Sequence, residues 1–278
     1  MNKVYFGING QFGDIMMQEP ALRSFIEGNP ETKIILGCSK RYEEILPLFE
    51  NYHENIIGFH AWEGYDNWPT KTDREYIEKQ KFDAMFPDKI PTHAQADWAK
   101  YRHATTETGL MLGVDVKTTK INLEKPAGVT TEPNSVAVHL FSSKWPQGLR
   151  SIELKKQKLI VSYLRHRGLK VYQLSGPGQP HLEGTILSEK PNYYNSCKIM
   201  LSTQFLVTCD SGMPWVASAY DHPTIGLYSS AYDAAVGTTK NWQPLNPNAV
   251  YLEAPSANQI SIYDIVHQID KKLDELSK

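Results

Sequence analysis

Cysteine is scarce in this chain: there are three residues among 278, with no CxxC pair and no spacing typical of metal ligands. Structural zinc sites and disulfide-stapled secreted domains both depend on such spacings. Cys38, Cys197 and Cys209 are therefore interpreted as small buried apolar residues, and a reducing compartment is expected.

The chain also lacks an excess of charge of either sign. Its formal charge is −2 and its isoelectric point is about 6.5. It therefore has no basic field of the kind that attracts nucleic acid, and no acidic tail. Nucleic acid is excluded as an expected partner.

Long apolar runs are missing too. Residues 1–14 hold a few apolar residues before a polar, glycine-containing break, which fits neither a signal peptide nor a membrane span. We expect a cytoplasmic protein, and peripheral proximity to a membrane is left open.

The first half of the chain alternates strand and helix patterns, which is typical of parallel sheets with crossover helices. Strands are predicted at residues 4–8, 33–37, 56–60 and 82–86, and helices at residues 20–27, 42–48 and 94–112. Residues 123–134 then turn to Pro, Gly, Thr and Glu without periodicity, as in a linker. An α/β protein of two domains is expected, residues 1–125 and 126–278.

The second half repeats the alternation. Strands are predicted at residues 135–141, 169–174, 205–209 and 223–228, with a short apolar stretch at residues 185–187, and helices at residues 152–167, 193–201, 214–220 and 260–276. The last helix has apolar residues at helical spacing, so it is expected to be amphipathic.

The most informative motif is CDSGMPWVASAYDHPTIGLY at residues 209–228, which places an acid, a hydroxyl and a glycine between an apolar strand and a helix. Unpaired N–H groups at a helix start favour phosphate oxygens, so the junction indicates an anion site. An ordinary connection in which Asp210 or Ser211 caps the helix explains the pattern equally well.

Three further loops follow strands, where open α/β sheets place their ligands. In GINGQFGDI at residues 7–15 the glycine spacing does not fit the dinucleotide fingerprint, and Asp14 is either a general base or a helix cap. In residues 139–148, two serines and Lys144 suit a diphosphate, although a solvated lysine gives the same pattern. The turn at residues 175–180, SGPGQP, either approaches a nucleotide or is simply tight.

Together these loops resemble glycosyltransferase family 9, the bacterial heptosyltransferase-like family, over most of the chain and in the expected order. The similar stretches are GDIMMQEPALRSF at residues 13–25, SSKWP at 142–146, SGP at 175–177 and DSGMPWVASAYDHP at 210–223. One departure is Trp215, which stands where the family pattern has histidine.

The resemblance implies a GT-B fold, in which two Rossmann-like domains face each other across a cleft. The first domain would bind an acceptor and the second a nucleotide-diphosphate sugar donor. The implied function is an inverting glycosyltransferase of lipopolysaccharide or glycan biosynthesis, which moves a heptose-like or other hexose-type sugar to a hydroxyl of a saccharide or glycolipid.

The resemblance also implies residue roles. Asp14 would be the catalytic base, with Gly10, Gln11 and Gly13 on the acceptor side. The donor-binding residues would be Ser142, Ser143, Lys144, Ser175, Gly176, Asp210, Ser211, Gly212 and Met213. No metal or other cofactor is implied, in keeping with the absence of a DxD motif, because a helix dipole and a lysine replace the charge of a divalent cation.

Two other classes stay open. A sugar-nucleotide epimerase of the same fold would need carboxylates on both sides of a sugar ring, for which Asp14 and Asp210 are candidates. A catalytically degenerate binding module would keep the fold without turnover, and the departure at Trp215 favours it mildly.

Aromatic and histidine residues carry weaker signals. Trp62, Tyr65, Trp68 and Trp98 are either stacking platforms for a sugar or ordinary core residues. His93, His103 and His139 lack ligand-like spacing and are interpreted as structural or solvated rather than catalytic.

Overall fold

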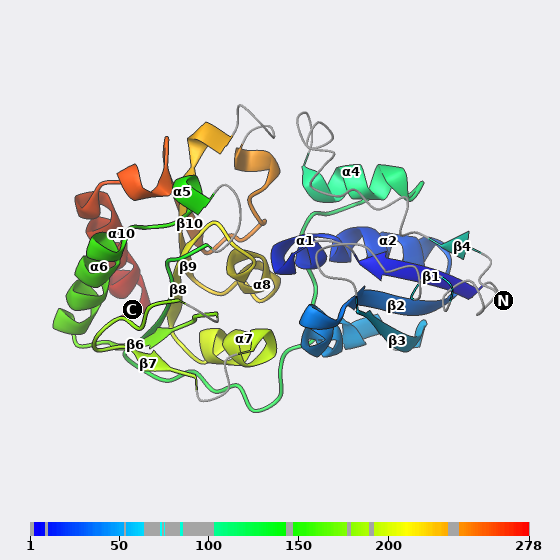
Figure 1. The fold of residues 1–278 in the computed structure, drawn as a ribbon, viewed down its shortest axis with the longest axis horizontal. Coiled ribbons are helices and arrows are strands. Elements are labelled where there is room, and N and C mark those ends of the chain that lie inside the picture. Colours follow the sequence, from blue (N-terminus) through cyan, green and yellow to red (C-terminus); the bar gives the residue numbers. More distant parts are fainter. Residues whose placement is uncertain are drawn as a thin grey trace. The chain divides into compact units, whose positions relative to one another are not determined.

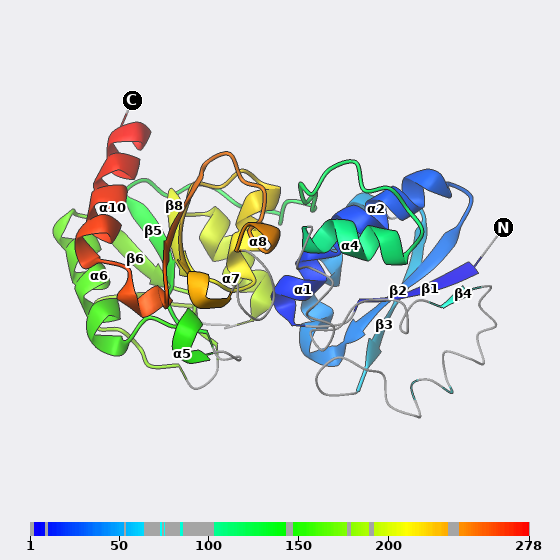
Figure 2. The same ribbon diagram turned by 90° about the horizontal axis from the view of Figure 1, so that it is seen from above.

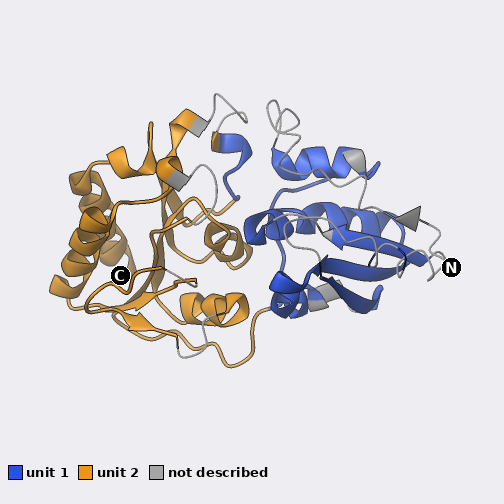
Figure 3. Ribbon diagram, in the orientation of Figure 1, with its two compact units in different colours: residues 1–124, 240–244 blue, residues 125–239, 245–278 orange. Residues whose placement is uncertain are grey.

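The computed structural model describes residues 3–8, 11–52, 54–63, 73, 75, 84–85, 103–142, 147–176, 179–188, 192–232 and 239–277. The chain divides into two compact units (Figure 3). Unit 1 comprises residues 1–124 and 240–244, and unit 2 comprises residues 125–239 and 245–278. Among the described residues no helix has the length and apolar character needed to cross a bilayer.

Unit 1 contains a parallel four-stranded sheet in the order β3-β2-β1-β4 (Figure 1). Its strands are β1 (Lys3–Ile8), β2 (Lys33–Ser39), β3 (Ile56–Trp62) and β4 (Ala84–Met85). The first three predicted strands are confirmed and run slightly further than expected. Of the fourth, predicted at residues 82–86, only β4 lies within the described residues.

The helical segments of unit 1 are α1 (Phe12–Met17), α2 (Glu19–Gly28), a 3₁₀ segment (Lys40–Tyr52) and α4 (Ala104–Met111). Helix α2 has proline in its first turn, as predicted. The α-helix predicted at residues 42–48 is wrong in type, because Pro47 lies inside the segment and cannot donate an α-helical hydrogen bond. Helix α1 was not predicted. The start of the helix predicted at residues 94–112 lies outside the described residues.

Unit 2 contains a parallel six-stranded sheet in the order β10-β9-β8-β5-β6-β7. Its strands are β5 (Ser135–His139), β6 (Lys170–Gln173), β7 (Ile186–Leu187), β8 (Phe205–Cys209), β9 (Thr224–Ser229) and β10 (Ala249–Ala254). The sequence prediction missed β10, whose residues are partly exposed along its length, so they show neither an alternating nor a buried pattern.

The helices of unit 2 are α5 (Gln147–Arg150), α6 (Leu154–His166), α7 (Tyr193–Leu201), α8 (Met213–Ala219) and α10 (Ile262–Leu276), with short 3₁₀ segments at Ser230–Tyr232, Thr239–Asn241 and Ala257–Gln259. Helix α10 begins two residues later than predicted, because Ser261 caps it by accepting from the Tyr263 amide. Figures 1 and 2 show α6 and α10 on one face of the sheet and α7 and α8 on the other.

The main core of unit 2 lies between the sheet and the pair α6 and α10. It gathers Val136, Val138, Val207, Ile225 and Leu227 from the strands with Ile160, Leu164, Ile265 and Ile269 from the helices. Alternate residues of β5, β8 and β9 therefore point away from this core, toward α7 and α8. These outward residues include His139, Thr208 and Tyr228.

Each sheet has a point at which the strand order reverses. In unit 1, β2 and β3 lie on one side of β1 and β4 lies on the other; in unit 2, β6 and β7 lie beyond β5, while β9 and β10 lie beyond β8. Open parallel sheets bind ligands outside the carboxyl ends of the strands at such a point. The residues that follow β1, β5 and β8 are therefore the places to look for a site.

Candidate functional site

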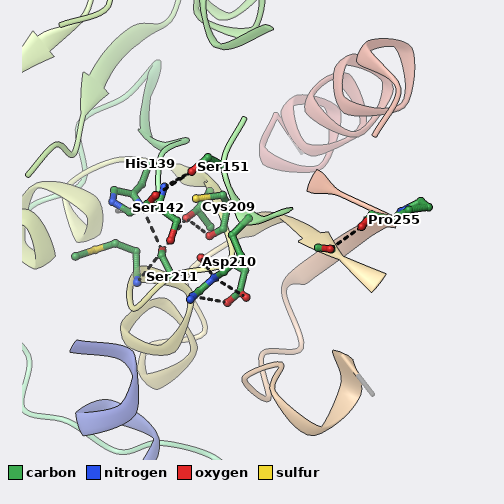
Figure 4. A network of polar contacts seen from close by, with 11 residues as sticks. His139, Ser142, Ser151, Cys209, Asp210, Ser211 and Pro255 are labelled. Carbon is green, nitrogen blue, oxygen red and sulfur yellow. Dashed lines mark hydrogen bonds and ion pairs between the residues drawn. The ribbon is translucent and has the colours of Figure 1, made fainter. Parts of the chain in front are cut away.

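The loop after β5 is closed by two serines. The Ser142 amide donates to Ser151 Oγ, and Ser151 Oγ donates to the Ser142 carbonyl, both at 2.9 Å (Figure 4). Ser142 is buried. This exchange fixes the start of the SSKWP loop at the switch point of unit 2. Ser143 and Lys144 lie outside the described residues.

An arginine that the sequence analysis missed joins this loop to the one after β8. Arg150 Nε lies 3.0 Å from Asp210 Oδ2, and Nη2 donates to Oδ1 at 3.2 Å. Arg150 Nε also donates to the Asp210 carbonyl at 3.1 Å. The two side chains are only 16% and 15% exposed, so the carboxylate of Asp210, a predicted donor-binding group, is engaged with a guanidinium in a poorly solvated place.

Ser211 lies at the centre of the polar network that follows β8 (Figure 4). Its Oγ is 3.1 Å from His139 Nδ1 and 3.4 Å from Thr208 Oγ1, and it accepts from the Met213 amide at 3.3 Å. The prediction that Asp210 or Ser211 is the N-cap residue of α8 is wrong, since no side chain caps this helix at its N-cap position. Ser211, one residue earlier, still accepts from an amide of the first turn. Gly212 is the residue at the N-cap position itself.

Burial and the arginine set the electrostatics of this network. Burial, helped by the positive charge of Arg150, lowers the pKa of His139 to about 4, so the imidazole is neutral at physiological pH. Burial also raises the pKa of the Cys209 thiol to about 12 and the pKa of the Tyr228 phenol. Cys209 is therefore an unreactive apolar residue, as predicted. Cys38 and Cys197 are buried free thiols as well.

A cavity of about 180 Å³ lies beside the carboxyl end of β6. Ser175 and Gly176 line it, together with Gln179 and with Ser188 and Ser196. Gln173 holds the surrounding loop: its Nε2 donates to the Pro180 carbonyl at 2.8 Å, and its Oε1 accepts from the Leu182 amide at 2.8 Å. Ser175 and Gly176 of the SGP motif thus form one wall of a small polar hollow, and Pro177 lies outside the described residues. A larger hollow of about 450 Å³ shares Ser188 and extends along α7.

In unit 1 the predicted base lies where the chain leaves β1. Asp14 Oδ2 accepts from the Gln11 amide at 2.7 Å, and the Gln11 side chain accepts from Tyr42 Oη at 2.6 Å. Gln11 and Asp14 form a capping box at the start of α1. The helix-cap alternative for Asp14 is therefore confirmed, and its role as a base stays a prediction. Gly13 is half-buried in α1, and Gly10 lies outside the described residues.

Of the aromatic and histidine candidates in unit 1, the two that the structure describes, Trp62 and His103, have structural roles. Trp62 is fully buried, so it belongs to the core and cannot stack on a sugar. His103 Nε2 contacts the Gln243 carbonyl at 3.1 Å, and burial lowers its pKa. Tyr65, Trp68, His93 and Trp98 lie outside the described residues. Among the described residues no group of three His, Cys, Asp or Glu side chains is arranged to hold a metal ion.

No protein-family model and no curated protein matches the sequence. Solved structures do match. ADP-heptose LPS heptosyltransferase II of E. coli aligns over 100% of both chains at 12% identity, with a TM-score of 0.74. A glycosyltransferase family 9 protein of Veillonella parvula covers 99% of this chain and 98% of its own, at 15% identity and a TM-score of 0.70. The E. coli heptosyltransferase WaaC, solved with ADP, covers 97% and 99% at 14% identity, with a TM-score of 0.66.

At identities of 12 to 15% these likenesses establish the fold. The chain has the fold of heptosyltransferases and of a family 9 glycosyltransferase, so the resemblance drawn from the sequence motifs is confirmed at that level. The mixed α/β architecture with parallel sheets is likewise confirmed, and the cleft between facing domains stays a prediction.

Proposed function

We propose that this protein is an inverting, metal-independent glycosyltransferase. It transfers a heptose-like or other hexose-type sugar from a nucleotide-diphosphate donor to a hydroxyl of a saccharide or glycolipid acceptor, as in the synthesis of lipopolysaccharide or a related glycan. The observation that carries the proposal is the cluster of Ser142, Arg150 and Ser211 at the strand-order reversal of unit 2, in a chain with the heptosyltransferase fold.

We assign the donor to unit 2. The hydroxyl of Ser142 and the amides of Ser211 and Gly212 supply hydrogen-bond donors for a diphosphate at the carboxyl ends of β5 and β8. The Met213 amide and Ser211 Oγ bond to each other and hold the start of α8 beside them. Ser175 and Gly176 line the small hollow next to them, which suits the nucleoside. The solved structures of WaaC with ADP and of an ADP-heptose enzyme support an adenine nucleotide as the first to test.

We assign the acceptor and the base to unit 1. The acceptor oxygen attacks the anomeric carbon of the donor sugar, the bond from that carbon to the diphosphate oxygen breaks, and the diphosphate leaves with the electron pair. The carboxylate of Asp14 takes the proton of the acceptor hydroxyl. The capping box supports this role, because it fixes the position of the carboxylate at the end of β1, while Gly10, Gln11 and Gly13 provide close approach of the backbone.

Positive charge for the leaving group comes from Lys144 and from Arg150. Lys144 is assigned through its place in the SSKWP motif. Arg150 is held near the same loop by Asp210, so Asp210 acts on the donor by positioning Arg150 and the loop after β8. Together these two cations stabilise a departing diphosphate without a divalent metal.

The two alternative classes are less well supported. An epimerase would use Asp210 as a second acid or base, and the paired contacts with Arg150 occupy both of its carboxylate oxygens. A degenerate module is favoured only by Trp215, which is 4% exposed within α8 and so serves packing at its position.

The first test is calorimetric titration with ADP, GDP, CDP and UDP, each with and without EDTA, followed by a product assay with the matching nucleotide sugars. Micromolar binding that EDTA leaves unchanged, and transfer of sugar to a saccharide or glycolipid, are expected. Binding without transfer to any acceptor would identify a binding module, and conversion of one nucleotide sugar into its epimer would identify the rival enzyme class.

The base is tested by Asp14→Asn, which keeps the size of the side chain. Transfer should fall by at least about a hundredfold, as is typical for loss of a general base, while nucleotide affinity stays within about threefold. Asp115→Asn is the matched control in the same unit, since Asp115 is 79% exposed and forms an ion pair with a surface lysine. An Asp14→Asn enzyme with normal turnover removes Asp14 from the mechanism.

A further inference from the structure

The hydroxyl of Ser211 has one proton and three neighbours. The Met213 amide donates to Ser211 Oγ, so the serine proton must go elsewhere. Thr208 Oγ1 donates its own proton to the Cys209 carbonyl at 2.9 Å and lies 3.4 Å from Ser211 Oγ. His139 Nδ1 lies closer, at 3.1 Å. The shorter contact is the better hydrogen bond, and it favours Ser211 as the donor and His139 Nδ1 as the acceptor.

This hydrogen bond fixes the tautomer of the imidazole. A neutral histidine carries one proton, so an accepting Nδ1 places that proton on Nε2. A second proton is disfavoured by burial and, to a smaller extent, by the guanidinium of Arg150. Nε2–H is therefore a permanent neutral donor at the carboxyl end of β5. Nε2 has no hydrogen bond with another described residue, and the ring belongs to the same network as Ser211 and Arg150.

We propose that His139 is a binding residue for the donor diphosphate, in which Nε2–H donates to a phosphate oxygen while Ser211 orients the ring. This inference rests on the proposed function, because it needs an anionic ligand at the reversal between β5 and β8. A neutral donor suits that place. It recognises a phosphate oxygen directionally and adds no charge beside Arg150. The spacing of His139 in the sequence indicated a structural or solvated residue, because spacing alone says nothing about a tautomer.

Two conservative variants separate ligand binding from a merely structural role. In His139→Asn the side-chain amide reaches the position of Nδ1, so the contact with Ser211 is kept and the Nε2 donor is lost. In His139→Gln the amide reaches the position of Nε2, so a donor is kept and the contact with Ser211 is lost. If His139 only supports the loop after β8, the asparagine variant should be the better of the two. If His139 binds phosphate, His139→Gln should bind the nucleotide more tightly than His139→Asn.

The experiment measures Kd for ADP, GDP, CDP and UDP by calorimetry with the full chain and both variants. For the nucleotide that the unmodified protein binds best, we expect affinity to fall about tenfold or more in His139→Asn, the effect of one hydrogen bond to a charged group, and to stay within about threefold in His139→Gln. Equal affinities, or the reverse order, overturn the inference while the proposed function stands. An unmodified protein that binds none of the four overturns both.

A second measurement is made on the unmodified protein, and a variant serves only to assign the signals. Nitrogen-15 spectra of the imidazole rings distinguish the two neutral tautomers, and the His139→Gln variant assigns the His139 signals by their loss. The inference requires protonated Nε2 and bare Nδ1 in the free protein, with the Nε2–H proton shifting when the best-binding nucleotide is added. The opposite tautomer refutes it.

Discussion

The ion pair between Arg150 and Asp210 can be tested by a double-mutant cycle on stability. The perturbations are Arg150→Met, which keeps the length of the side chain, Asp210→Asn, which keeps its shape, and the two together. The charges are 3.0 Å apart, and at an effective dielectric constant of about 20 their attraction is about 5.5 kcal/mol. Desolvation of two side chains that are 16% and 15% exposed offsets much of this, so we expect a coupling energy of about 2 kcal/mol.

The assay is urea unfolding of the four proteins, with the coupling taken from the difference of differences in the free energy of unfolding. The pair Lys117 and Asp115 is the matched control, because its side chains are 76% and 79% exposed. We expect a coupling below about 0.5 kcal/mol there. If the coupling of Arg150 and Asp210 is no larger than that of the control pair, the claim that burial strengthens this contact is refuted, and with it the positioning role given to Asp210.

The remaining predictions concern histidine titration and packing in unit 2. Burial, with the charge of Lys125, lowers the pKa of His222 to about 4. The unfolded chain therefore binds the proton at higher pH than the folded chain, and the free energy of unfolding falls as the pH drops from about 6.5 to 4. Between pH 7.5 and pH 5 the loss of stability is about 2 kcal/mol. His222→Asn should remove that part of the pH dependence in unfolding titrations, and an unchanged difference between the two pH values would show that His222 does not titrate in this window. Gly226→Ala should cost about 1 to 3 kcal/mol by overpacking, because the new Cβ would lie 2.5 Å from Tyr251 Cδ1 and 2.9 Å from Tyr228 Cε2. Its control is Gly28→Ala, whose Cβ meets nothing within 4 Å and should leave the midpoint of thermal unfolding nearly unchanged; equal effects of the two substitutions would contradict the packing argument.

The sequence predicted elements well wherever local pattern decides them. The buried runs that became β1, β2 and β8 are continuous and apolar, and α7 has the predicted bounds. Prediction from the sequence failed where the local pattern of residues and the tertiary packing favour different structures. The partly exposed β10 has no local signature, and it forms because its backbone pairs with β9 in register.

In the candidate site, too, the residues of local motifs were predicted and those that depend on distant partners were not. Ser211 was identified because its motif is local, and its hydroxyl does satisfy an amide two residues on. Arg150 was missed because its partner is 60 residues away in sequence, and only the strand order brings the two loops together. The tautomer of His139 depends on a serine 72 residues away. Groups whose chemistry is set by a remote partner cannot be found from spacing in a single sequence.

The two hydrogen bonds between Ser142 and Ser151 leave the length of the loop after β5 free to change in evolution. Ser142 and Ser151 are nine positions apart, and their two hydrogen bonds close the segment between them at its base. The entropic cost of closing a loop rises only slowly with the number of residues in it. Residues could therefore be inserted or deleted between Ser142 and α5 while β5, α6 and the ion pair of Arg150 keep their places. The reach and chemistry of this loop can vary among related chains without any change to the sheet that carries it.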